Sequence, residues 1–399
     1  MVNEKIKACE ENLIHVYNRF PVAFDHGDGM MIYDTEGKEY LDFAAGFAVT
    51  GLGYNNKELA QALKDQIDKI YHISNLYFHE SCGEAAKALN RLSGMDRVFF
   101  TNSGSEANEG ALKAARRYAY TKNTGRFEFI AMENSFHGRS FGAVSITGHD
   151  SYREPFEPVV PGVKFATFND LESVKELVSD KTCAIILEPL QGEGGINLAT
   201  DEFMKGIRKL CDENDILMIC DEVQCGMGRT GNYFTYQGFD VKPDIVTMAK
   251  AIGNGIPVGA FAMTEEVAQY SLKPGDHGAT YGGNPLACTA VKKVIEIFER
   301  EKIVDHVNKV APYLEKRMDE LVETYDFIVR RKGKGLMQGL EFTIPVGELN
   351  QQTLKEGLLV IQAQGNVIRF VPPLIMEEKH VDEMIIRLKR AFKNMNLIG

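Results

Sequence analysis

The stretch "DEFMKGIRKLCDENDILMICDEV", residues 201–223, joins a helical period to a short apolar run and decides the fold class. Its first part places apolar residues on one face of a helix, and "ILMIC" has the length of a buried strand. The same alternation recurs at "DRVFFTNSG" (96–104), "FEFIAM" (127–132), "KTCAIILEP" (181–189) and "PDIVTMAK" (243–250). Strands that alternate with helices predict an α/β fold with a mostly parallel central sheet and helices on both faces.

Polar residues follow the predicted strands at the points where they end. Gly104 and Ser105 follow the first strand, and Glu188, Asp221 and Lys250 end later ones. Ligands of such sheets bind beyond the carboxyl ends of the strands. A lysine directly after a buried strand is unusual, because lysine is rarely buried without a partner. Lys250 therefore either reaches solvent or takes part in chemistry.

Each of these residues also has an ordinary structural explanation. Ser105 could cap the helix that begins near Gly104, or that helix terminus could bind a phosphate. Asp221 could cap the next segment or face a buried cation, and Lys250 could extend to solvent. Together, a phosphate site, a buried acid and a lysine on neighbouring strand ends favour pyridoxal 5'-phosphate, which combines a phosphate, a ring nitrogen and an aldehyde.

The two ends of the chain have a different pattern from the middle. Residues 30–43, "MMIYDTEGKEYLDF", predict a hairpin, and "VIRFVPPL" (367–374) predicts a strand that two prolines end. We predict a large domain over residues 62–294 and a smaller α+β domain formed by residues 1–61 and 295–399.

Composition excludes several classes of partner. The 399 residues carry a formal net charge of −11, so a broad basic surface for nucleic acid or anionic lipid is not expected. The first 20 residues lack the apolar core of a signal peptide, and no window has the length of a membrane span. We therefore expect a cytoplasmic protein. The seven cysteines form no C-x-x-C pair, so we expect neither a disulfide framework nor a metal site.

Seven motifs carry a family resemblance from about residue 15 to the C-terminus. They resemble those of the class III aminotransferases of fold type I, which bind pyridoxal 5'-phosphate and act as homodimers. The motifs are "NSGSEAN" (102–108), "SFHGRS" (135–140), "EPLQGEGG" (188–195), "DEVQCGMGRTG" (221–231), "AKAIGNGIPVGA" (249–260), "HGATYGGNPLAC" (277–288) and "NVIRFVPPLI" (366–375).

The resemblance implies roles for residues around the cofactor. Lys250 matches the lysine that bonds to the cofactor aldehyde and later moves a proton. Asp221 matches the acid that pairs with the ring nitrogen, and Gln224 the contact to the phenolic oxygen. Phe136 matches the aromatic residue that stacks on the ring, although a core phenylalanine would also fit the sequence.

Gly104 and Ser105 match the family's phosphate site. Thr280 matches a residue that reaches the phosphate from the partner subunit, which implies active sites shared across the dimer. We treat His137, beside Phe136, as a structural residue.

Two arginines match the family's carboxylate sites. Glutamate has one carboxylate beside its reacting amine and one at its far end, so its site needs two cations at different depths. The resemblance implies that Arg369 binds the near carboxylate and Arg139 the far one. Without the resemblance, both arginines could equally form surface salt bridges.

Within the class, the motifs are most similar to those of the acetylornithine aminotransferases of arginine biosynthesis. This implies reversible transfer of the δ-amino group of N-acetylornithine to 2-oxoglutarate, which gives N-acetylglutamate semialdehyde and glutamate. N-acetylornithine has no carboxylate beside its reacting amine, so Glu193 would neutralise Arg369 in that half-reaction. Phe47 lies near the expected substrate entrance, where a bulky apolar residue favours an amide-capped amine over a charged one.

Other functions remain open from the sequence. Ornithine, succinylornithine, 4-aminobutyrate or N-succinyl-diaminopimelate could replace N-acetylornithine in the same chemistry. Two further alternatives do not involve amino transfer to a keto acid. One is a class III isomerase or decarboxylase, and the other is a silent homologue that only binds the cofactor.

Overall fold

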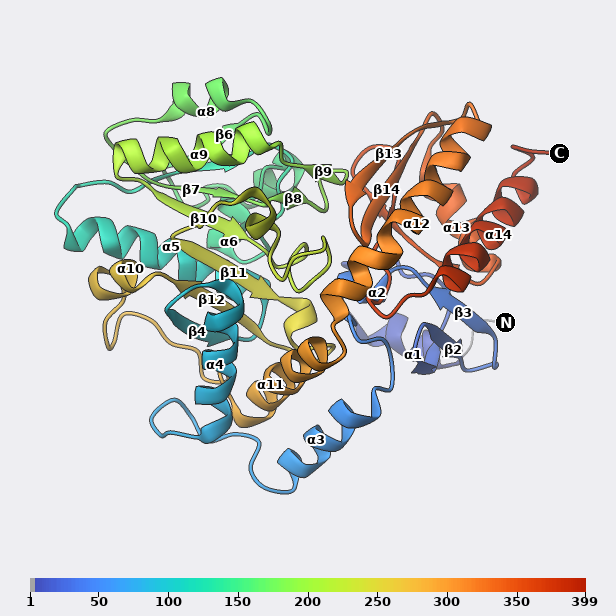
Figure 1. Ribbon diagram of the computed structural model, residues 1–399, viewed down its shortest axis with the longest axis horizontal. Helices are drawn as coiled ribbons and strands as arrows, with labels where there is room; N and C mark the ends of the chain where they lie inside the picture. Colours follow the sequence, from blue (N-terminus) through green and yellow to red (C-terminus); the bar gives the residue numbers. More distant parts are fainter. Residues whose placement is uncertain (1–3) are drawn as a thin grey trace.

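The computed structural model describes residues 4–399 and contains a seven-stranded sheet at its centre (Figure 1). In spatial order the strands are β4 (Arg97–Thr101), β12 (Gly259–Met263), β11 (Ile245–Ala249), β10 (Leu217–Asp221), β7 (Thr182–Leu187), β5 (Glu128–Met132) and β6 (Val163–Ala166). Five neighbouring strands, from β11 to β6, are parallel. β12 runs antiparallel to both β11 and β4.

Side chains of these strands alternate between two hydrophobic cores, one on each face of the sheet. In β10, Met218 and Cys220 belong to one core, and Leu217 and Ile219 to the other. A strand that is buried on both faces has a continuous run of apolar residues in its sequence, which explains the pattern of "ILMIC". The predicted α/β class, with a mostly parallel sheet covered on both faces, is confirmed; β6 and β12 are strands that the sequence analysis did not predict.

Helices connect these strands and cover the sheet (Figure 1). They are α4 (Glu80–Ser93), α5 (Gly104–Thr121), α6 (Phe141–Ser145), α7 (Asp150–Arg153), α8 (Leu171–Leu177), α9 (Asp201–Asn214) and α10 (Glu265–Tyr270), with short 3-10 turns at η1 (Glu154–Phe156), η2 (Thr235–Phe239) and η3 (Lys250–Ile252). A small hairpin of β8 (Leu190–Gln191) and β9 (Asn197–Leu198) follows β7.

Segments from both ends of the chain lie together beside this sheet, and both termini are on the same side of the molecule (Figure 1). The predicted hairpin is present, since β2 (Met31–Asp34) pairs antiparallel with β3 (Glu39–Asp42). Strand β3 also pairs in parallel with β15 (Leu358–Leu359) from the C-terminal part. The N-terminal elements are α1 (Glu4–Asn12), β1 (Phe24–Asp28), β2 (Met31–Asp34), β3 (Glu39–Asp42), α2 (Ala45–Ala48) and α3 (Lys57–Ile67).

The C-terminal part adds a second four-stranded sheet in the order β13-β14-β17-β16. Its elements are α11 (Pro285–Arg300), α12 (Ile303–Thr324), β13 (Ile328–Lys334), β14 (Met337–Phe342), α13 (Val346–Lys355), β15 (Leu358–Leu359), β16 (Ile361–Ala363), β17 (Val367–Phe370) and α14 (Glu378–Asn394). The boundaries that we assign to two domains, 62–294 and the two flanking segments, stay a prediction.

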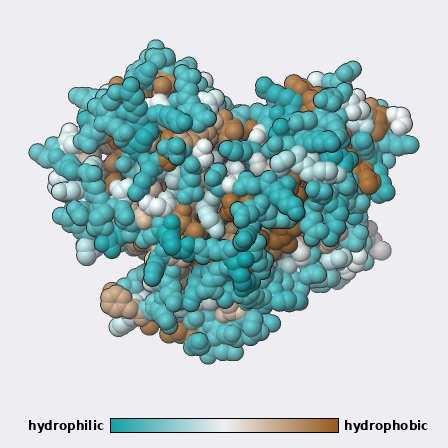
Figure 2. All heavy atoms as spheres, viewed as in Figure 1, coloured by the Kyte–Doolittle hydropathy of each residue, from teal (hydrophilic) through white to brown (hydrophobic). Residues whose placement is uncertain are grey.

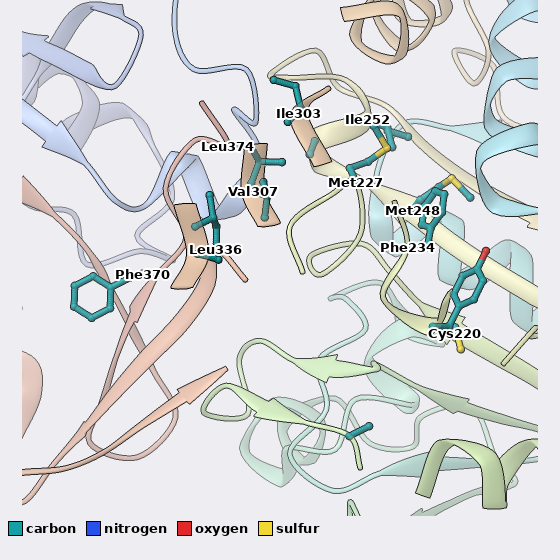
Figure 3. Close-up of a cluster of buried hydrophobic side chains, with 14 of the residues drawn as sticks. Cys220, Met227, Phe234, Met248, Ile252, Ile303, Val307, Leu336, Phe370 and Leu374 are labelled. Atoms are coloured by element: carbon teal, nitrogen blue, oxygen red, sulfur yellow. The ribbon is translucent and has the colours of Figure 1, made fainter. Parts of the chain in front are cut away.

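A continuous buried cluster joins the central sheet to the C-terminal part. Figure 3 shows Cys220 of β10 and Met248 of β11 in the same cluster as Val307 of α12, Leu336 and Phe370 of β17. All five side chains are almost completely buried. This packing holds β17, which carries Arg369, in a fixed position relative to the ends of β10 and β11.

The face of the molecule in Figure 2 is largely hydrophilic, with hydrophobic residues visible in the central recess and in small scattered patches. Among residues 4–399, no helix has both the length and the apolar character needed to cross a membrane.

Candidate active site

The carboxyl ends of β7, β10 and β11 border a cavity of about 200 Å³. The parallel register pairs Asp221 with Thr247, so Asp221 and Lys250 come to the same edge of the sheet. The cavity is lined by Ser103, Gly104, Ser105, Asn108, Phe136, His137, Gly138, Glu188, Glu193, Asp221, Val223, Gln224 and Lys250. Seven residues to which the sequence analysis assigned a cofactor or substrate role thus line the same cavity. They are Gly104, Ser105, Phe136, Glu193, Asp221, Gln224 and Lys250.

Lys250 leaves strand β11 in a strained conformation. Its φ is +51°, a left-handed value that a non-glycine residue seldom adopts and that clusters at functional sites. Protein atoms surround the side chain, although it keeps some accessibility because it borders the cavity. Burial and the nearby charge of Arg369 lower the pKa of Lys250 to about 8, against the opposing effects of Glu193 and Asp221. The neutral, nucleophilic fraction of this lysine near neutral pH is therefore far larger than that of an ordinary lysine.

Three donors hold the carboxylate of Asp221 in place. One oxygen accepts hydrogen bonds from Nδ1 of His137 at 2.7 Å and from the amide nitrogen of Asn108 at 2.8 Å. The other oxygen accepts from the backbone N–H of Val223 at 3.0 Å. Asp221 is only 3% exposed, so the cavity presents a buried acid of fixed orientation.

The N-terminus of α5 forms the opposite part of the cavity wall. The N-cap is Ser103, whose hydroxyl accepts from the backbone N–H of Glu106 at 3.2 Å. Ser105 is therefore not the cap: it lies in the first turn, and its Oγ accepts from the backbone N–H of Arg139 at 3.2 Å. A side chain on Gly104 would meet Val223 at 2.8 Å, so this position needs glycine. The free N–H groups of an 18-residue helix here suit an anion such as a phosphate.

Glu188 supports the loop that carries Phe136. Its carboxylate accepts from the backbone N–H of Phe136 at 3.1 Å and from that of Gly192 at 3.3 Å. Burial raises the pKa of Glu188 to about 7, although His137 opposes the shift. The side chain of Phe136 is partly buried and borders the cavity.

Arg369, in β17, is fully buried beside the cavity. Its guanidinium donates to Oε1 of Gln224 at 2.9 Å and pairs with Oε1 of Glu193 at 3.1 Å, while its Nε has no partner among residues 4–399. Glu193 keeps about a quarter of its side chain exposed. The buried cation is therefore neutralised by an acid that is itself partly exposed to solvent.

Phe47 covers Arg369 from the N-terminal part of the chain. The guanidinium carbon lies 5.4 Å from the centroid of the Phe47 ring. Phe47 is 49% exposed and belongs to a left-handed turn, in which Ala45, Gly46, Phe47 and Ala48 all have positive φ. Asp42 holds this turn by accepting from the backbone N–H of Ala45 at 2.8 Å.

Arg139 and Thr280 do not line the cavity. Arg139 is exposed, and its guanidinium carbon lies 5.5 Å from the ring centroid of Phe136, which lines the cavity. Thr280 is exposed on the loop that precedes α11, so the structure does not bring it to the cavity of its own chain.

His137 and Asn108 are two site residues whose contacts the sequence analysis missed. We treated His137 as structural, yet it contacts Asp221 directly. Asn108 lies four residues after Gly104 on α5, and this spacing, which puts both residues on one face of the helix, was the available signal. The amide nitrogen of Asn108 also donates to the carbonyl of His137 at 2.7 Å, so the two residues form one support for Asp221.

The residues present fit pyridoxal 5'-phosphate. Gly138, with φ +134°, lies so close to Ser105 that a Cβ would be 2.1 Å from its Oγ, which keeps the backbone around the α5 terminus open to an anion. The α5 terminus would hold the phosphate, Asp221 the ring nitrogen and Lys250 the aldehyde carbon. No group of three or more His, Cys, Asp or Glu side chains within residues 4–399 could hold a metal ion.

Comparison with known proteins agrees with this assignment. The model of the family "Aminotransferase class-III" matches residues 14–392. The chain is 44% identical to an acetylornithine aminotransferase of Methanocaldococcus jannaschii over 95% of both chains. It is 46% identical to one of Clostridium acetobutylicum over 96% of this chain and 99% of that protein.

A solved structure is similar over almost the whole chain. It is an ornithine aminotransferase from Toxoplasma gondii with partial occupancy of PLP at its active site. The TM-score is 0.93 at 29% identity, and the match covers 98% of this chain and 94% of that one. The predicted family and cofactor are confirmed: the chain belongs to the class III aminotransferases, and its cofactor is pyridoxal 5'-phosphate.

Proposed function

We propose that this chain is an acetylornithine aminotransferase, which moves the δ-amino group of N-acetylornithine to 2-oxoglutarate in arginine biosynthesis. The products are N-acetylglutamate semialdehyde and glutamate. The observation that carries this function is the contact of the buried Arg369 with Glu193, together with the second cation, Arg139, which lies against Phe136 of the cavity wall. The identity to named acetylornithine aminotransferases supports the choice of substrate.

The bound cofactor supplies an electron-withdrawing ring that stabilises negative charge at the carbon from which a proton is removed. The protein supplies the remaining parts of the reaction. Nζ of Lys250 would hold the aldehyde carbon of the cofactor and would carry the proton to and from the substrate carbon. Asp221 would hold the ring nitrogen in its protonated form, and His137 and Asn108 keep its carboxylate in position.

Two cations at different depths distinguish the two half-reactions. Glutamate presents a carboxylate beside its reacting amine, which Arg369 binds when Glu193 moves away. N-acetylornithine presents none there, so Glu193 stays on Arg369 and prevents an unpaired buried cation. In both half-reactions Arg139 receives the remote carboxylate.

Phe47 restricts the entrance above Arg369. Its ring, which lies against Arg369 and is half exposed, would present apolar surface to the entering amine substrate. A free α-ammonium, as in ornithine, would lose water there without gaining a partner, whereas the acetylated nitrogen carries no charge. Phe47 therefore favours N-acetylornithine over ornithine.

The proposal includes a homodimer with shared active sites and a cytoplasmic location. The amide nitrogen of Asn75 donates to two carbonyls that flank Thr280, both at 3.0 Å. Leu76, Phe78 and Tyr281, beside this loop, expose large apolar surfaces. Several large apolar side chains exposed near one another in the chain fold are typical of an interface, which supports a partner subunit that covers the loop and receives Thr280 at its phosphate site.

Turnover with a panel of amines tests the substrate. We expect kcat/KM with N-acetylornithine to exceed that with ornithine, succinylornithine, 4-aminobutyrate and N-succinyl-diaminopimelate, with 2-oxoglutarate as acceptor. A higher value for another amine would retain the chemistry and replace the substrate. Product formed without any keto acid would instead indicate an isomerase or decarboxylase.

The pKa of Lys250 predicts how fast the apoprotein takes up its cofactor. Only the neutral amine attacks the aldehyde, so the rate of covalent attachment should rise with pH and level off above about pH 8. An ordinary lysine, with a pKa of 10.5, would need a far higher pH. Absorbance after mixing apoprotein with cofactor measures this rate. A midpoint near pH 10 would contradict the shifted pKa.

The same shift has a consequence for stability. Between about pH 8 and 10.5 the unfolded chain binds more protons at Lys250 than the folded apoprotein does, so the free energy of unfolding should rise with pH in this window.

A further inference from the structure

Arg139 lies against an aromatic ring that the sequence analysis did not select. Its guanidinium carbon is 3.6 Å from the ring centroid of Tyr152, which belongs to α7. The Tyr152 ring meets that of Phe136 edge-on, with centroids 6.1 Å apart. Phe136 borders the cavity, so Tyr152 connects the cavity wall to Arg139.

The side chain of Arg139 has no acceptor of its own within residues 4–399, where it forms neither an ion pair nor a side-chain hydrogen bond. Arg153, one residue after Tyr152, differs from Arg139 because its guanidinium has acceptors within the protein. Arg153 donates to the carbonyl of Thr147 at 2.6 Å and pairs with Asp150. The donors of Arg153 are occupied, and those of Arg139 are available.

Stacking on an aromatic ring holds a guanidinium without using its donors. The ring attracts the flat face of the cation, while the N–H groups point outward in the plane of the guanidinium. Two of those N–H groups then remain free to bind a carboxylate side by side. A carboxylate partner, such as that of Arg369, would instead compete with the substrate.

The backbone of Arg139 is anchored as well. Its N–H donates to Oγ of Ser105 in the first turn of α5, at the predicted phosphate site. Arg139 is thus held at its backbone by α5 and at its guanidinium by Tyr152.

We propose that Tyr152 is a positioning residue that holds Arg139 ready to bind the carboxylate remote from the reacting amine. This role rests on the proposed function, because it needs a substrate that carries such a carboxylate. Tyr152 thereby contributes to selection of amino acids over simple amines of the same length.

Two substrates that differ only in this carboxylate test the role. N-acetyl-1,4-diaminobutane is N-acetylornithine without the carboxylate. Tyr152→Leu should raise KM for N-acetylornithine by about 3- to 5-fold, the upper part of the range expected for loss of a cation–π contact to an exposed cation. It should leave kcat/KM for N-acetyl-1,4-diaminobutane within about twofold, because that substrate makes no use of Arg139.

Three further variants control for structural effects. Tyr152→Phe keeps the ring face and should retain the wild-type KM. Tyr120→Leu removes a similar stacking pair elsewhere, since Arg117 lies 5.2 Å from the exposed Tyr120 ring, and should change neither substrate. In an Arg139→Met background, Tyr152→Leu should add no further loss of discrimination, because both changes remove the same contact.

The outcomes separate this inference from the proposed function. An equal loss with both substrates in Tyr152→Leu would overturn the positioning role, because it would indicate general damage to the cavity wall. Discrimination that is lost in Arg139→Met but intact in Tyr152→Leu would overturn the role of Tyr152 alone. A wild-type enzyme that does not discriminate between the two substrates would overturn both the proposed function and the inference.

Discussion

Replacing Lys250 by alanine should lower kcat with N-acetylornithine by roughly 10⁴-fold, the upper range for loss of a positioned acid–base group. The variant loses both the amine that attaches to the cofactor and the amine that moves the substrate proton. Among residues 4–399, no other lysine lines the cavity. Steady-state kinetics measures the loss, and borohydride reduction followed by mass spectrometry measures covalent attachment, which should disappear.

Two controls make this result specific. Lys209→Ala removes an exposed lysine that pairs with Glu213 on α9, and it should leave kcat unchanged. The Lys250→Ala protein should still bind the cofactor without a covalent bond, because the N-terminus of α5 and Asp221 are intact. Residual activity within about tenfold of wild type would contradict the role of Lys250, since general acid–base groups contribute 10²- to 10⁴-fold.

Asp221→Asn should have the second-largest effect, a decrease in kcat of roughly 10²- to 10³-fold, as found when one preorganised electrostatic contact is removed. The amide keeps the shape of the carboxylate but carries no charge to hold a proton on the ring nitrogen. Asp221→Ala is less informative, because it would also leave His137 and Asn108 without their acceptor, at a cost of about 1–3 kcal/mol for each buried unsatisfied group.

Glu222 provides the matched control for Asp221. It is the next residue and is also almost fully buried, but it accepts from the backbone N–H of Tyr236 at 2.9 Å and from Sγ of Cys225 at 3.2 Å. Because Glu222 does not line the cavity, Glu222→Gln should retain kcat within a few fold. Equal losses in the two variants, measured on protein of equal cofactor content, would contradict a specific role for Asp221.

Much of the sheet could be predicted because its central strands are buried on both faces. Strands β10 and β11 appear in the sequence as continuous apolar runs that end at Asp221 and Lys250. Strand β12 was missed because "GAFAM" begins with glycine and follows a glycine-rich turn, so its pattern does not reveal an antiparallel partner.

The motifs select residues that line one cavity, whereas the contacts between distant segments could not be predicted. Asp221 meets His137 across 84 residues and Asn108 across 113, and sequence spacing gives no measure of such contacts. The pairing of Arg139 with Tyr152 likewise depends on how α7 packs beside the cavity.

The turn at Phe47 is a further feature that the sequence could not reveal. Alanine and phenylalanine rarely adopt positive φ, so nothing in "AAGFA" indicates a left-handed turn. Hydrogen bonds to Asp42 and packing of the surrounding core hold this conformation.

The visible absorption of the purified protein during addition of amines tests the central claim most directly. The band of the cofactor bound to Lys250 should bleach faster with N-acetylornithine than with ornithine or 4-aminobutyrate in parallel samples, and it should return when 2-oxoglutarate is added. Bleaching only with another amine would contradict the proposed substrate. A protein that shows no band, even with added pyridoxal 5'-phosphate, would contradict the account of the site.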